Sequence, residues 1–129
     1  MTPAIGFVGS LCITLVFLGA AVFTGFKARR KRHLCCVAGA VLMLVSTIYY
    51  AIALGELFDL ESSGIVTPIH LTTAKINTAA YLFPVITGIW TIKNPSKRKL
   101  HGRVAMAVLV LTVFTAVTGT MMLAWATPL

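Results

Sequence analysis

Four long stretches of mostly apolar residues dominate this sequence and restrict sharply what the chain can fold into. About 20 apolar residues suffice for a helix to cross the hydrocarbon core of a bilayer. Because a backbone in lipid must satisfy its own hydrogen bonds, each stretch is expected to be a helix. Short connections make successive helices antiparallel neighbours. The sequence therefore predicts an all-α membrane protein, a single domain of residues 1–129, with an up-down bundle of four transmembrane helices at residues 5–26, 34–55, 66–92 and 95–127.

Composition and charge exclude other classes of protein. Hydrophobic residues make up 58% of the chain and charged residues 11%, whereas a soluble domain carries about 25% charged residues. Disorder requires low hydrophobicity and is excluded as well. The net charge of +8 is concentrated in two short segments rather than spread along a surface. Such clusters are typical of membrane-protein loops and argue against a nucleic-acid partner. The clusters are Lys27, Arg29, Arg30, Lys31 and Arg32, and Lys93, Lys97, Arg98, Lys99 and Arg103.

The distribution of charge also predicts the orientation of the chain in a membrane. The basic clusters lie between the first and second stretches and between the third and fourth, so these loops are expected in the cytoplasm. The acidic residues Glu56, Asp59 and Glu61 lie in or beside the middle loop. Both termini are then expected outside, with an uncleaved first span. The predicted location is the cytoplasmic membrane of a bacterium, where the lipid bilayer is the first partner.

Three cysteines do not form a disulfide framework. Cys12 lies within the first stretch, and Cys35 and Cys36 follow the first basic cluster. We expect them to be small buried hydrophobic residues. A metal site that uses the cysteine pair beside His33 is an alternative interpretation.

A shift of 68 residues superimposes two basic hairpins and indicates an internal repeat. Lys31-Arg32-His33 opens the second stretch, and Lys99-Leu100-His101 opens the fourth. The two halves are therefore interpreted as repeats of a two-helix unit. In the second hairpin, Asn94-Pro95 predicts an N-cap followed by proline at the first helical position. His101 is thus expected well inside a helix, whereas no such cap precedes His33.

His33 and His101 are the leading candidates for a cofactor site. In an up-down bundle the second and fourth helices are diagonal, so two inward imidazoles would clamp one haem iron from both faces. Small residues near the same level would leave room for the macrocycle; they are Gly25, Ala38, Gly88 and Ala105. Basic side chains beside the histidines would pair with the haem propionates. These are Lys31, Arg32, Lys99 and Arg103.

Two other interpretations of this histidine pair stay open. Histidine is amphipathic, and one in each basic loop would also suit the headgroup region of the membrane. The basic residues are already explained by topology. A metal other than haem iron is the remaining alternative.

A polar stripe marks the third stretch. At 100° per residue His70, Thr73, Asn77 and Tyr81 share one face, which is expected to turn into the bundle. Such residues often serve as hydrogen bonds between helices. The functional alternative is a quinone, haem or metal site that uses His70, Asn77 and Tyr81. Lys75 faces away from the stripe, and it is interpreted as snorkelling or pairing with Glu56, with a role in ligand or subunit binding as the alternative.

From His33 to the C-terminus, the chain resembles small bacterial four-helix membrane proteins of the cytochrome b561-like kind, and most closely a branch associated with terminal-oxidase maturation. The resemblance lies in four short motifs. They are Lys31-Arg32-His33, Pro68-Ile69-His70-Leu71, Ser96-Lys97-Arg98-Lys99-Leu100-His101-Gly102-Arg103 and Thr118-Gly119.

The resemblance implies a b-type haem between diagonal helices, or a helper that delivers haem or copper to an oxidase. Members of the b561 group usually carry two histidine pairs, whereas this chain supplies one pair and His70. A single haem near one face does not relay electrons across about 30 Å of hydrocarbon without a redox partner.

Three hypotheses about function follow. The first is a haem-binding protein of electron transfer or respiratory-oxidase maturation. The second is a non-catalytic accessory or assembly subunit of a larger membrane complex, docked through the glycines of the first helix (Gly6, Gly9, Gly19 and Gly25), because small residues allow close helix approach. The third is a quinone- or small-molecule-binding protein. The sequence contains no glycine-rich phosphate loop and no nucleophile elbow, so hydrolase or transferase activity is not expected.

Overall fold

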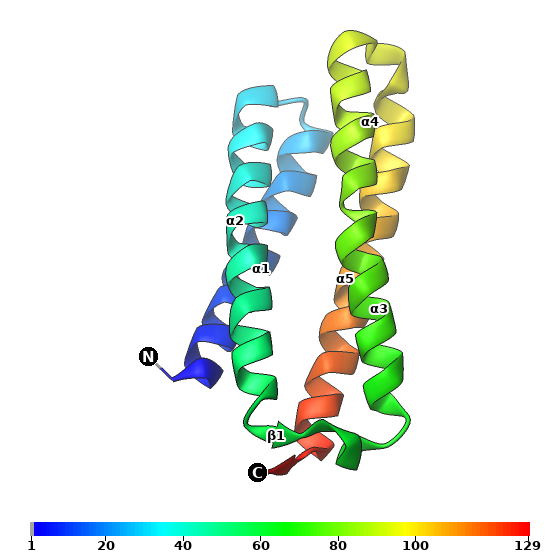
Figure 1. Ribbon diagram of the computed structural model, residues 1–129. Helices are drawn as coiled ribbons and strands as arrows, with labels where there is room; N and C mark the ends of the chain where they lie inside the picture. Colours follow the sequence, from blue (N-terminus) through cyan, green and yellow to red (C-terminus); the bar gives the residue numbers. More distant parts are fainter. Residues whose placement is uncertain (1) are drawn as a thin grey trace. The chain divides into compact units, whose positions relative to one another are not determined.

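The computed structural model describes residues 2–129, and nearly all of them are helical (Figure 1). Two-residue strands and short 3₁₀ turns occupy the connections. The long helices are α1 (Pro3–Phe26), α2 (Arg30–Gly55), α3 (Val66–Ala80), α4 (Leu82–Lys93) and α5 (Arg98–Trp125). The short elements are β1 (Phe58–Asp59), η1 (Leu60–Ser63), η2 (Pro95–Lys97) and β2 (Thr127–Pro128).

The chain divides into two compact units, each built around a helical hairpin. The first unit comprises Met1–Phe58 and Pro128–Leu129, and in it α1 packs along α2. The second unit comprises Asp59–Thr127, and in it α3 and α4 pack on α5. This division places one helix-opening histidine of the sequence repeat in each unit.

Three helical segments within residues 2–129 are long and apolar enough to cross a membrane. They are Pro3–Phe26, Arg30–Gly55 and Pro95–Trp125. The segment predicted as a helix at 66–92 is helical, but it is interrupted at Tyr81, between α3 and α4. Pro84 lacks the N–H that would bond the carbonyl of Ala80, and its ring crowds the preceding turn. The interruption therefore lies within the turn that precedes this proline.

The helix starts after the two basic turns also differ in part from expectation. α2 begins at Arg30, four residues before the predicted start. The side chain of Asn94 accepts a hydrogen bond from the N–H of Ser96 (3.1 Å) and caps the 3₁₀ turn that leads into α5. The Asn94-Pro95 prediction is thereby confirmed, although the first residues after the cap form a 3₁₀ turn rather than an α-helix.

Buried side chains in the hairpins are mostly small or polar, whereas many large apolar side chains point outward. Thr14 is only 1% exposed, while Val16 and Phe26 are 71% and 73% exposed. Small residues allow close contact between helices, and an outward apolar surface of this kind suits an apolar surrounding. The pattern accords with helices that cross a membrane.

Hydroxyl groups close the end of the second unit opposite its basic turn. The hydroxyl of Ser63 donates to the carbonyl of Met122 (2.6 Å), near the end of α5. The N–H of Thr127 donates to the hydroxyl of Ser62 (2.9 Å). The carbonyl of Met122 also accepts from the N–H of Ala126 (2.9 Å), so the bond from Ser63 adds a second donor and links η1 to α5.

Candidate functional site

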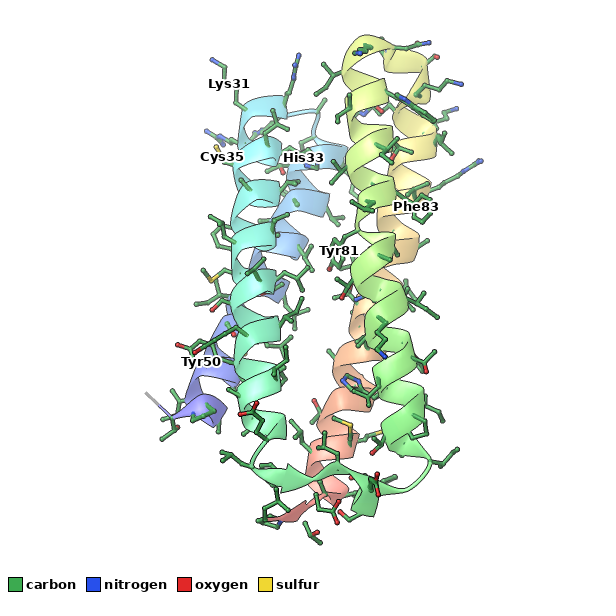
Figure 2. All side chains as sticks on the ribbon, viewed as in Figure 1. Lys31, His33, Cys35, Tyr50, Tyr81 and Phe83 are labelled. Atoms are coloured by element: carbon green, nitrogen blue, oxygen red, sulfur yellow. The ribbon has the colours of Figure 1, made fainter. Side chains whose placement is uncertain are left out.

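His33 lies in the first turn of α2, with its ring against α1. A Cβ atom added to Gly25 would lie 3.3 Å from two ring atoms of His33. The Nδ1 atom is 2.8 Å from the carbonyl oxygen of Ala21. Because a carbonyl only accepts, Nδ1 carries the proton, and in the neutral ring Nε2 carries the lone pair. In Figure 2, His33 lies at the same end of α2 as Lys31 and Cys35.

His101 occupies a similar position in the second unit. Its Nδ1 atom is 3.2 Å from the hydroxyl oxygen of Thr87 on α4. The hydroxyl of Thr87 donates its own proton to the carbonyl of Phe83 (2.8 Å). The ring nitrogen is therefore the donor toward Thr87, and the lone pair again falls on Nε2. A Cβ atom on Gly88 would lie 3.3 Å from the ring.

His70, on α3, has a similar arrangement against α5, in the half of α5 away from His101. Its Nδ1 atom is 3.2 Å from the hydroxyl oxygen of Thr118, and that hydroxyl is within 3.1 Å of the carbonyl of Phe114. A Cβ atom on Gly119 would lie 2.7 Å from the ring, so only glycine fits there without a shift.

Each of the three histidines therefore faces a Thr-Gly dipeptide on a neighbouring helix of its own unit. These dipeptides are Thr24-Gly25, Thr87-Gly88 and Thr118-Gly119. Sequence reasoning noted Gly25 and Gly88 only as small residues and did not connect the dipeptides with the histidines. Their recurrence, once for each histidine, was the signal that would have found the arrangement.

The predicted polar stripe of α3 faces α5, as expected. Asn77 is only 5% exposed, and its side-chain oxygen is 3.2 Å from the hydroxyl of Thr112. The hydroxyl of Tyr81 is 2.8 Å from the same oxygen of Thr112. Thr73 is half-buried and bonds the carbonyl of Ile69 in its own helix (2.7 Å). These contacts are hydrogen bonds between and within helices, and ligand binding by His70, Asn77 and Tyr81 stays a prediction.

The basic residues predicted to contact propionates are exposed, and Lys75 is exposed on α3. Of the small residues expected to make room for a macrocycle, Gly25 and Gly88 lie against the histidine rings. Ala38 is exposed and Ala105 is half-buried. The four basic side chains are Lys31, Arg32, Lys99 and Arg103.

The expectation that all three cysteines are buried is wrong. Cys12 and Cys35 are exposed and Cys36 is partly exposed. In lipid an apolar side chain avoids water without being covered by protein, so an apolar helix need not turn its cysteines inward. Among residues 2–129 there is no group of three histidine, cysteine, aspartate or glutamate side chains placed to hold a metal ion.

The glycines of α1 also divide into two sets. Gly6 lies against the ring of Tyr50 and Gly25 against His33, so the first hairpin already covers both. A Cβ atom on Gly9 or Gly19 would meet nothing within 4 Å. The docking surface predicted from four glycines is therefore reduced to these last two.

No protein-family model, curated protein or solved structure matches this chain. The resemblance to cytochrome b561-like proteins accordingly stays a prediction.

Proposed function

We propose that this chain is an integral membrane protein that binds one b-type haem through His33 and His101. The protein acts in electron transfer or in the maturation of a respiratory oxidase. The proposed haem lies near the basic, cytoplasmic ends of the spans.

The matched anchoring of the two histidines carries this proposal. In each hairpin an oxygen on the preceding helix accepts a hydrogen bond from Nδ1–H of the histidine, with an N···O distance of 2.8 Å for His33 and 3.2 Å for His101. Metal-ligating histidines in proteins donate the N–H of their other ring nitrogen to an oxygen in the same way, and this hydrogen bond fixes the ring orientation and the tautomer. A histidine that merely rests among lipid headgroups needs no such partner on a neighbouring helix.

The residues present suit a haem of this type. Two imidazoles complete the axial ligation of a b-type iron without thiolate or thioether. Cationic side chains close to the histidines in sequence suit the two propionates. They are Lys31, Arg32 and Lys99, which precede a histidine, and Arg103, which follows one. When bound, the haem supplies one-electron chemistry. The chain itself would orient the two histidine ligands and hold the haem next to apolar helices.

A single haem near one face needs a partner for electron transfer across the membrane. About 30 Å of hydrocarbon separates the two faces. We therefore expect the protein to exchange electrons at the cytoplasmic face or to work beside a larger redox complex.

The test is the visible spectrum of the full chain, expressed with haem supplied and purified in mild detergent. The proposal predicts a Soret band and split α and β bands after dithionite reduction, which indicate six-coordinate b-type haem. A featureless spectrum would overturn it.

A second candidate function is that of a colourless accessory subunit. It is favoured by one observation, the openness of α1 at Gly9 and Gly19, where no side chain lies within 4 Å of an added Cβ. This hypothesis predicts stoichiometric co-purification with a membrane complex. Replacing both glycines with leucine would abolish it, while the same change at Gly102, also open but on α5, would not.

A further inference from the structure

The three Thr-Gly dipeptides point to a role for the threonines beside the histidines. Thr87 and Thr118 each place a hydroxyl oxygen 3.2 Å from a histidine Nδ1. The following glycine in each pair removes the Cβ that would otherwise crowd the ring. In these two pairs, the residue that accepts the hydrogen bond is therefore followed directly by the glycine that makes room for the ring.

The threonine hydroxyls act as acceptors toward the rings because their own protons are engaged within the helix. Thr87 donates to Phe83 at 2.8 Å, and Thr118 lies within 3.1 Å of the carbonyls of Phe114 and Thr115. An acceptor at Nδ1 selects the tautomer in which Nε2 is the basic nitrogen.

The first hairpin reaches the same tautomer by a different route. His33 donates to the backbone carbonyl of Ala21, while Thr24 bonds the carbonyl of Ala20 in its own helix (2.7 Å). Ala21 and Thr87 are therefore the equivalent acceptors, one a carbonyl and the other a side-chain hydroxyl.

We propose that Thr87 is a positioning residue that fixes the tautomer of His101 and thereby makes Nε2 its ligand nitrogen. This proposal rests on the proposed haem function for its biological meaning. The effect on the ring itself does not require haem. Because Thr87 acts through its side chain and Ala21 through its backbone, substitution of Thr87 removes the hydrogen-bond acceptor at Nδ1 of His101 and leaves the acceptor at Nδ1 of His33 in place.

The decisive experiment is ¹⁵N NMR of the histidine rings in the full, haem-free chain, in detergent and at a pH where the rings are neutral. In the wild type, His101, His33 and His70 are each expected with the proton on Nδ1. In Thr87→Val, His101 alone shifts toward the form with the proton on Nε2, and Thr87→Ser restores it. Unchanged signals from His33 and His70 show that the variant is folded.

Thr91→Val is the matched control. Thr91 lies one turn further along α4 and bonds the carbonyl of Thr87 (2.9 Å), and its replacement is expected to leave all three rings unchanged. A His101 ring that keeps its wild-type tautomer in Thr87→Val overturns the proposal.

A second measurement connects the tautomer to the proposed function. In protein loaded with haem, loss of the Nδ1 hydrogen bond makes His101 a poorer electron donor to ferric iron. The midpoint potential of Thr87→Val should therefore rise, and Thr87→Ser should return it toward the wild-type value. An unchanged potential overturns the ligand role of Thr87. Failure of the wild type to bind haem overturns the proposed function, whereas the haem-free spectra decide the tautomer separately.

Discussion

The two helical hairpins each hold a histidine near a basic turn, but they do so by different local means. In the first, α1 ends at Phe26, Ala28 in the following turn has the left-handed conformation (φ 53°), and α2 starts without a side-chain cap. In the second, Asn94 caps the turn that leads into α5. His33 donates to a backbone carbonyl, and His101 donates to a threonine hydroxyl. In the second hairpin, side chains therefore shape the turn and hold the histidine, whereas in the first hairpin the backbone does both.

The largest expected effect tests what the hairpins share. His33→Ala and His101→Ala should each abolish the haem absorption, because one imidazole alone leaves the iron without its second axial ligand. The measurement is the reduced visible spectrum per mole of purified chain. His70→Ala is the control and should keep the absorption. Full absorption in either of the first two variants would contradict the assignment.

The next effect, on the free energy of unfolding, concerns the glycines that lie against the histidine rings. Gly119→Ala places a Cβ 2.7 Å from His70, and overpacking of this kind costs about 1–3 kcal/mol of unfolding free energy. Gly102→Ala, also on α5, meets nothing within 4 Å and should cost nothing. Denaturation in detergent measures both. Equal stability of the two variants would show that the close approach of the His70 ring to Gly119 does not matter for stability.

Substitutions in the two basic turns should change the free energy of unfolding in opposite directions. In the first turn, the N–H of Arg29 donates to the carbonyl of Thr24 (3.0 Å), and the N–H of Ala28 donates to the carbonyl of Gly25 (3.1 Å). Helix ends with this hydrogen-bond pattern prefer glycine at the left-handed position, which Ala28 occupies here. Ala28→Gly should raise the free energy of unfolding by about 1 kcal/mol. Asn94→Ala removes a cap and should lower it by about 1 kcal/mol. Thermal unfolding would reveal the difference, and shifts of the same sign would refute it.

The smallest effect separates the hydrogen bonds at the two helix interfaces. Tyr81→Phe removes the bond to Thr112 (2.8 Å), and interhelical bonds in membranes average about 0.6 kcal/mol. The hydroxyl oxygens of Thr14 and Thr47 are 3.1 Å apart, but each hydroxyl also donates to a carbonyl of its own helix at 2.8 Å. Thr47→Val should therefore cost less than Tyr81→Phe. The reverse order in equilibrium unfolding would contradict this comparison.

Periodicity and charge were enough to predict the helices and the polar stripe of α3. Asn77 and Tyr81 face α5 because residues four apart share a helix face. The Asn94 cap was equally predictable, since asparagine before proline has a local stereochemical meaning. Both features depend on spacing within one segment.

Features that depend on two helices at once were not predictable in the same way. The contact of His101 with Thr87 and Gly88 requires the rotation of α4 against α5, which no single-segment pattern contains. The exposure of Cys12 was missed because hydrophobicity does not tell a lipid-facing side chain from a buried one. Pro84 marks a point where the helix is distorted, but the sequence alone does not identify Tyr81 as the residue at which it is interrupted.

The proposed haem function requires that His33 and His101 bind the same iron. Pulsed electron paramagnetic resonance of the ferric protein, prepared with ¹⁵N-labelled histidine, tests it most directly. We expect a low-spin signal coupled to two axial imidazole nitrogens in the wild type, and the same signal in His70→Ala. A high-spin signal, or a single axial imidazole in the wild type, would contradict it.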